Sequence, residues 1–110
     1  MSQYEREELE FSQIHSAAKE LRTEGNGLYK DSAYWKAIKK YRKAAQILEE
    51  YPVIGSKDES ERQSLLYTLY VNLAQCYLKV NRPQQACIAC HCGFRNKEHL
   101  DKTSAKIFHR

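Results

Sequence analysis

Five polar side chains of this sequence have the types and the spacing needed to hold a carboxylate. They are Arg22 with Asn26, then Asn72, then Lys106 with Arg110. Residues four apart on a helix project to the same side, so each of the two pairs can converge on one ligand. Cations neutralise a carboxylate, and an asparagine amide can meet peptide groups of both polarities. The pattern predicts a binding site for an acidic peptide.

The segment Cys87-Ile88-Ala89-Cys90-His91-Cys92 contains residue types that could bind a metal or a haem. Cys-x-x-Cys-His is the attachment pattern of c-type haem, and sets of Cys and His bind zinc. Haem attachment requires export, and the zinc ligands of this segment do not share one helix face well. We therefore expect no metal and no cofactor. Buried thiols that act as small hydrophobes are the favoured interpretation, with Cys90 pointing into a helix pair.

No combination of residues predicts catalysis in this segment. The histidines at positions 15, 91, 99 and 109 are dispersed, and no Ser or Cys has a base and an orienting acid beside it in a recognisable pattern. We expect a binding module and not an enzyme.

Composition limits the class of protein further. A chain of 110 residues with 42% hydrophobic residues, 2 Pro and 4 Gly is one globular domain or a fragment of one. A net charge of +4 is too small to argue for direct nucleic-acid binding. No apolar run approaches the length of a membrane span, and four Cys without a secretory leader favour reduced thiols. We expect a cytoplasmic protein that contacts neither a membrane nor nucleic acid directly.

Two stretches that repeat one another must position the polar side chains. Residues 25–44 (GNGLYKDSAYWKAIKKYRKA) align with residues 74–93 (AQCYLKVNRPQQACIACHCG), with small residues Gly25 and Ala74 at equivalent places. The spacing of small and bulky residues predicts helix–turn–helix tetratricopeptide units, whose usual period is about 34 residues. The two units are 74 − 25 = 49 residues apart, which leaves roughly 15 extra residues between them.

The predicted fold is therefore all-α, with two tetratricopeptide repeats and the start of a third in a right-handed superhelical stack. The first repeat is predicted over 12–51, with Asp31 or Ser32 capping its second helix. A loop follows over 52–58. The second repeat is predicted over 59–96, with helices over 59–79 and 83–96, and the third repeat begins over 101–110. Small residues such as Gly25 are expected to let the two helices of a unit approach closely.

The strings EGNGLYKDSAYWKAIKKYRKA, YVNLAQCYLKVNRP and KIFHR resemble the tetratricopeptide domain of the large FKBP-type immunophilin co-chaperones. The resemblance covers about residues 12–110. That family holds the C-terminal Glu-Glu-Val-Asp tail of the 90-kDa heat-shock chaperone in a carboxylate clamp. The resemblance implies that the tail would contact these residues: Arg22, Asn26, Tyr29, Asn72, Lys106 and Arg110.

The string YLKVNRPQQA is similar to the germline, Shutdown-like subgroup of these immunophilins, which is linked to the piRNA pathway. The resemblance also implies that an FKBP-type isomerase domain precedes this segment in the intact protein. Whether such a domain is active stays open.

Two alternatives remain at this point. A strict period would put Lys102 and Lys106 at the clamp positions of the third repeat, whereas the local Lys-x-aromatic pattern favours Lys106 with Arg110. The C-terminal tail of the 70-kDa heat-shock chaperone is a second candidate ligand. The alternative function is a scaffold without a working clamp, which binds another partner or associates with itself through an exposed terminal helix.

Overall fold

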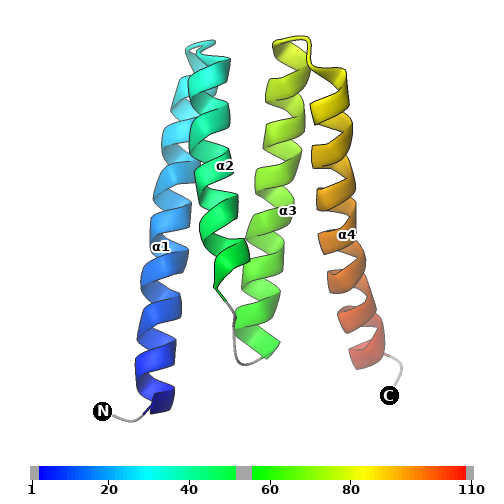
Figure 1. Ribbon diagram of the computed structural model, residues 1–110. Coiled ribbons are helices and arrows are strands. Elements are labelled where there is room, and N and C mark those ends of the chain that lie inside the picture. Colours follow the sequence, from blue (N-terminus) through cyan, green and yellow to red (C-terminus); the bar gives the residue numbers. More distant parts are fainter. Residues whose placement is uncertain (1–2, 52–55, 109–110) are drawn as a thin grey trace.

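The structure is a computed structural model that describes residues 3–51 and 56–108, with side chains described for 10–51 and 57–95. This part of the chain forms four helices and no strand: α1 (Gln3–Lys30), α2 (Tyr34–Glu50), α3 (Ser56–Lys79) and α4 (Pro83–Phe108) (Figure 1). The all-helical class predicted from the sequence is confirmed for these residues. None of the helices in the described part of the chain is both long enough and apolar enough to cross a membrane.

The helices lie side by side in chain order, and each runs opposite to the one before it (Figure 1). α1 packs on α2 and α3 packs on α4, while α2 and α3 join the two pairs and α1 also reaches α3. Among the described elements, α4 packs on α3 alone. The turns that close the two pairs lie at one end of the molecule, and the start of α1 and the end of α4 lie at the other (Figure 1).

The two closing turns have the same hydrogen bonds. In the first, Ala33 N–H donates to the Leu28 carbonyl at 2.8 Å, and in the second Arg82 N–H donates to the Tyr77 carbonyl at 2.8 Å. Both turns place a non-glycine residue in the left-handed region, Ser32 at φ 61° and Asn81 at φ 60°. This is the Schellman arrangement, which ends a helix by satisfying its last carbonyls. The turns recur at a spacing of 82 − 33 = 49 residues, which is the spacing of the sequence repeat.

The predicted cap of α2 is wrong. Ala33 occupies the N-cap position and makes no side-chain capping bond. Ser32 is instead the left-handed residue that ends α1, and the backbone N–H of Asp31 donates to the Gly27 carbonyl. Ser32 therefore closes the end of α1 through its backbone and does not cap the start of α2 with its side chain.

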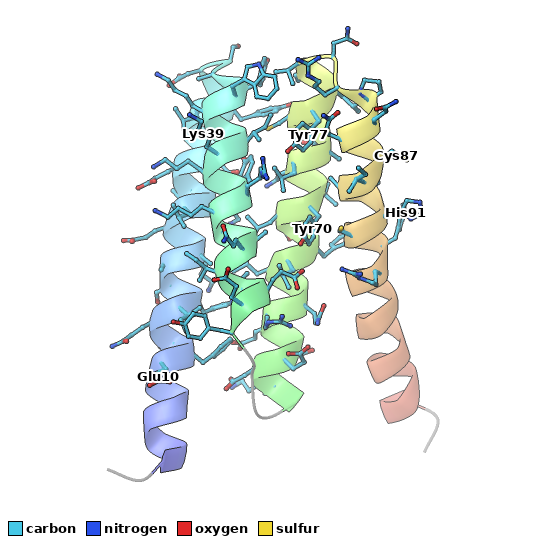
Figure 2. All side chains as sticks on the ribbon, in the orientation of Figure 1. Glu10, Lys39, Tyr70, Tyr77, Cys87 and His91 are labelled. Carbon is cyan, nitrogen blue, oxygen red and sulfur yellow. The ribbon has the colours of Figure 1, made fainter. Side chains whose placement is uncertain are left out.

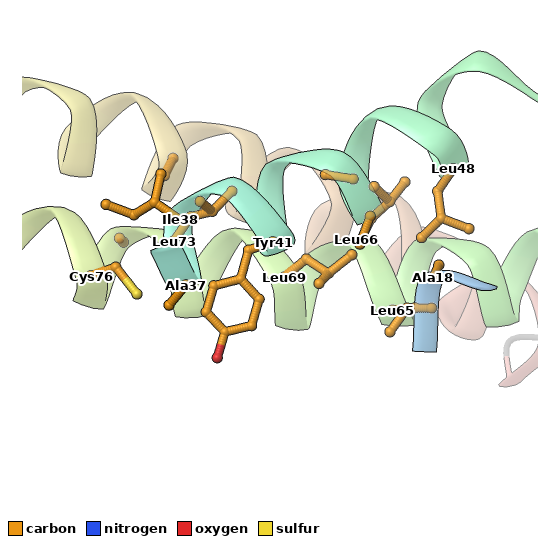
Figure 3. Close-up of a cluster of buried hydrophobic side chains, with 14 of the residues drawn as sticks. Ala18, Ala37, Ile38, Tyr41, Leu48, Leu65, Leu66, Leu69, Leu73 and Cys76 are labelled. Carbon is orange, nitrogen blue, oxygen red and sulfur yellow. The ribbon is translucent and has the colours of Figure 1, made fainter. Parts of the chain in front are cut away.

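The core lies between the helices and is built mainly from α2 and α3 (Figure 3). The buried apolar residues of α2 and α3 are Ala37, Ile38, Tyr41, Ala44, Ala45, Leu48, Leu65, Leu66, Leu69, Leu73, Ala74 and Cys76. Gly25 allows α1 to approach α2 closely, because a Cβ atom at this position would lie 2.7 Å from Cε1 of Tyr41. The expected role of this small residue is confirmed.

Arg62 of α3 fixes the joint between the two helix pairs. Its Nε donates to the Leu48 carbonyl at 2.7 Å, which satisfies a carbonyl near the end of α2. The same guanidinium contacts the carboxylates of Glu59 at 3.2 Å and Glu49 at 3.8 Å. Tyr70 also donates its hydroxyl hydrogen to Glu49 at 2.9 Å. The relative position of α2 and α3 is therefore held by polar contacts as well as by the core.

The break predicted between residues 96 and 101 is absent, because α4 continues without interruption to Phe108. Residues 97–108 (KEHLDKTSAKIF) contain no proline and no glycine, so no strong helix breaker ends α4 there. Asp101, the first residue of the predicted third repeat, is of a type that often caps helices, but it lies inside the helix.

Candidate functional site

The predicted site residue Asn26 is held by Tyr41 across the first helix pair. The Tyr41 hydroxyl donates to Oδ1 of Asn26 at 2.5 Å. Burial raises the pKa of Tyr41 to about 12, and nearby Cys76 and Tyr29 add to this rise. The hydroxyl therefore stays protonated at neutral pH and remains a donor. Because the amide oxygen accepts this bond, the two amide N–H donors of Asn26 are directed away from Tyr41, and Asn26 is exposed.

Arg22 lies one turn before Asn26 on α1 and is half-buried. Its positive charge offsets part of the rise in the pKa of Tyr41 and adds to the lowering of the pKa of His15. Among the described residues, Arg22 has no hydrogen bond and no ion pair. Lys40, by contrast, is neutralised by Glu24 at 3.0 Å. Arg22 is thus a cation without an acidic partner in this part of the chain.

Asn72 of α3 is half-buried and has no hydrogen-bond partner among the described side chains. It lies one turn before Cys76, which is close enough to Tyr41 to affect its pKa. Residues four apart share a helix face, so Asn72 belongs to the side of α3 that faces α1 and α2. The structure therefore brings Arg22 and Asn26 together and places Asn72 on the adjoining face of the next pair.

Tyr29, the aromatic residue of the predicted site, is also part of the packing of the first pair. Its ring meets that of Tyr34 edge to face, with 5.3 Å between the ring centroids. The ring is half-buried and packs against the core. A peptide contact at Tyr29 would use only the part of the ring that this packing leaves exposed.

The second half of the predicted clamp falls at the end of the part of the chain that the structure describes. Lys106 is in the last turn of α4, its side chain lies outside the described part of the chain, and Arg110 lies outside it altogether. At 1.5 Å per residue, Lys106 is about 35 Å along the helix from Pro83, whereas Asn72 is about 10 Å from the turn end of α3. Lys102, the other register, lies on the same helix. The backbone of the continuous helix therefore carries Lys102 and Lys106 away from the turn end near which Asn72 lies.

His15, which is not among the predicted site residues, lies close enough to Arg22 for the charge of Arg22 to affect its pKa. It stacks on Phe11 at 5.3 Å between ring centroids, and burial lowers its pKa, with further lowering from Lys19 and Arg22. Glu61 and Asp58 of α3 act on the same ring in the opposite direction. His15 precedes Arg22 by two helical turns, a spacing that places the two residues on one side of α1.

The cysteines do not behave as one buried group. Cys76 is fully buried, as expected for a core position, and burial raises its pKa to about 11. Cys87 and Cys90 are exposed, so the prediction that Cys90 points into a helix pair is wrong. The reason is that no described helix covers this side of α4. Within the described residues, no three or more His, Cys, Asp or Glu side chains are grouped so that they could hold a metal ion.

Comparison with known proteins relates the chain to a curated protein. No family model matches the chain, and no solved structure matches it. The chain is similar to the inactive peptidyl-prolyl cis-trans isomerase shutdown of Bombyx mori, with 35% identity over 72 residues. The matched stretch covers 66% of this chain and spans 16% of the length of the silkworm protein. The comparison therefore relates the chain to a short part of a protein named as an inactive isomerase.

Proposed function

We propose that this chain is a peptide-binding module of a co-chaperone, and that it captures the acidic C-terminal tail of the 90-kDa heat-shock chaperone. Arg22 neutralises a carboxylate, while Asn26 and Asn72 donate to the carboxylate and to the peptide main chain. The observation that carries this proposal is the bond from Tyr41 to Asn26 at 2.5 Å. It fixes the orientation of one amide beside a half-buried arginine that has no acidic partner among the described residues.

Lys106 and Arg110 are the proposed second half of a carboxylate clamp, as in a tetratricopeptide superhelix. Their participation requires that α4 break between about residues 96 and 101 when a peptide binds, so that the following residues can turn back toward α3. The half-site formed by Arg22, Asn26 and Asn72 needs no such change, and we propose that it provides the first contact with the tail.

The similarity to the silkworm protein supports a wider proposal. We propose that the intact protein is an FKBP-like, inactive isomerase of the germline piRNA pathway, acting in the cytoplasm, with this segment as its partner-binding part. The alternative, a scaffold that associates with itself without a working clamp, is supported by a different feature, which is the exposed outer side of α4.

The test is isothermal calorimetry with a peptide ending in Glu-Glu-Val-Asp. Arg22→Glu and Asn72→Ala should each weaken binding by about 10- to 100-fold, since hydrogen bonds to charged groups contribute roughly 1.5–3 kcal/mol. Lys36→Glu is the charge-matched control, because Lys36 is an exposed cation on α2. An affinity for the tail that survives both site substitutions would refute the half-site.

Lys106→Glu separates the half-site from the full clamp. If α4 stays continuous in the complex, the affinity for the tail is unchanged by this substitution. If α4 breaks and supplies the second half, affinity falls as it does for Asn72→Ala. Circular dichroism at 222 nm reports the helical content of each variant, so that unfolding is not mistaken for loss of binding.

A further inference from the structure

The side of α4 that faces away from α3 carries four exposed or partly apolar side chains at helical spacing. We name this set the terminal seam and define it as Cys87, Cys90, His91 and Phe94. All four residues are exposed, and Phe94 is exposed to 61%. Their positions i, i+3, i+4 and i+7 place them along one helix face. Cys87 and His91 are both marked on this outer helix in Figure 2.

The sequence repeat shows what this face does in the other helix pair. At the spacing of 49 residues, the counterparts of Cys87, Cys90 and Phe94 are Ile38, Tyr41 and Ala45 of α2. All three counterparts are buried in the core between α1, α2 and α3, whereas the counterpart of His91 is Arg42, which is exposed. The terminal seam thus corresponds to a largely buried face of α2, but no described helix covers it. Its thiols and its aromatic ring suit contact with another helix.

The charge pattern indicates which partner can cover it. Residues 83–94 contain no Asp, Glu, Lys or Arg, whereas the equivalent residues 34–45 contain five cations. This is unusual for a chain in which 29% of residues are charged. A face without charges can lie against an identical face without like-charge repulsion, which would oppose the same pairing through α2. The face is also neutral toward acidic and basic partners alike.

We propose that a second copy of this chain docks on the terminal seam, through an antiparallel pairing of the two α4 helices. A two-fold axis near Cys90 sets this residue against Cys90 of the second copy. The sums 90 + 90 = 180 and 87 + 94 = 181 differ by one residue, which is about 1.5 Å along the helix, so the same pairing sets Cys87 close to Phe94 of the second copy. A small thiol then meets a large ring at both ends of the contact, which is the self-complementary arrangement that a two-fold interface requires. Sulfur and aromatic rings also attract one another.

The proposed interface is small. One helix face buries less than the ~800 Å² per partner of a standard complex, so the dissociation constant is expected to be on the order of tens of micromolar. The dimer should therefore appear only in concentrated solution. The half-site at Arg22, Asn26 and Asn72 lies on other helices, so self-association does not depend on peptide binding.

Sedimentation equilibrium of the full chain under reducing conditions tests this proposal. The apparent mass should rise toward a dimer between roughly 5 and 300 µM. Phe94→Lys should weaken self-association by about tenfold or more, because it puts one cation of each copy into the contact. Leu78→Lys is the matched control, since Leu78 of α3 is 63% exposed and lies outside the seam. A chain that is monomeric throughout, or a control that weakens association equally, overturns the proposal.

A short bismaleimide tests the register of the pairing and does not depend on the lysine variant remaining folded. The wild-type chain and Cys87→Ser should form a cross-linked dimer, whereas Cys90→Ser should lose it. Both thiols are exposed on the same helix, so random collisions would link them equally. Cross-linking that persists in Cys90→Ser, or that Cys87→Ser removes as well, overturns the antiparallel pairing.

Discussion

The closest approach between α1 and α2 leads to a prediction that two glycines of one helix can test against each other. A Cβ atom on Gly25 would lie 2.7, 2.9 and 3.0 Å from Cε1, Cδ1 and Cζ of Tyr41, whereas a Cβ atom on Gly27 would meet nothing within 4 Å. Unstrained carbon–carbon contacts are about 3.5–4.0 Å. Gly25→Ala must therefore displace the Tyr41 ring or the helix, whereas Gly27→Ala needs no adjustment.

Two opposing terms decide the size of the effect. Replacing glycine by alanine inside a helix stabilises it by up to about 1 kcal/mol, and overpacking a core costs about 1–3 kcal/mol. The helix term is shared by both variants, so the difference between them isolates the steric term. We expect Gly27→Ala to be about 0.5–1 kcal/mol more stable than wild type, and Gly25→Ala to be about 1–3 kcal/mol less stable than Gly27→Ala.

Urea unfolding followed by circular dichroism at 222 nm gives both free energies of unfolding under the same conditions. The displaced Tyr41 ring should also lose its bond to Asn26, so Gly25→Ala should weaken peptide binding while Gly27→Ala should not. If Gly25→Ala proves as stable as Gly27→Ala, the close approach of α1 to α2 is not as the structure shows it.

Three further predictions follow from burial and hydrogen bonding. The pKa of Tyr41 is raised to about 12 in the folded chain, so above pH 10 the unfolded chain binds fewer protons than the folded chain. The free energy of unfolding should therefore fall by about 1.4 kcal/mol per pH unit up to pH 12. Urea unfolding midpoints measured at pH 9 to 11 should show this fall, and the fall should be smaller in Tyr41→Phe. Arg62→Ala should cost about 1–3 kcal/mol of unfolding free energy, because it removes the bond to the Leu48 carbonyl, while Lys40→Ala, which removes an exposed ion pair, should change it by less than about 1 kcal/mol. The exposed thiol of Cys90 should react with Ellman's reagent within seconds, and the buried thiol of Cys76 should react only on unfolding.

The helices and the core were predictable because both depend on local pattern. Leucines and alanines at spacings of three and four mark the faces of α2 and α3, and proline at position 83 marks the start of α4. The cap at Ser32 was not predictable from residue type, because the Schellman closure of α1 uses the backbone of that residue. The end of α4 was also mispredicted, because a suitable cap at Asp101 does not by itself stop a helix that lacks a breaker.

The candidate site was predictable only within each helix. The spacing of Arg22 and Asn26 places them on one face, but the partner that orients Asn26 is Tyr41, 15 residues away on another helix. Such a contact depends on tertiary packing and leaves no periodic signal. The same limit applies to Cys90, which is exposed. Its predicted burial required a covering helix that the described part of the chain does not supply.

The linear arrangement of the helices has a consequence for cooperativity. Each described helix packs mainly on its neighbours in chain order, and α4 packs on α3 alone. The free energy of unfolding is therefore close to the sum of the contributions of the two helix pairs and of the junction between α2 and α3. Arg62 and the leucines of α2 and α3 supply that junction. Amide hydrogen exchange should therefore be slowest in α2 and α3 and faster in α4, which can open by fraying without disturbing the rest. The molecule would then unfold first at α4, and Tyr41 with its bond to Asn26 would be among the last parts to open.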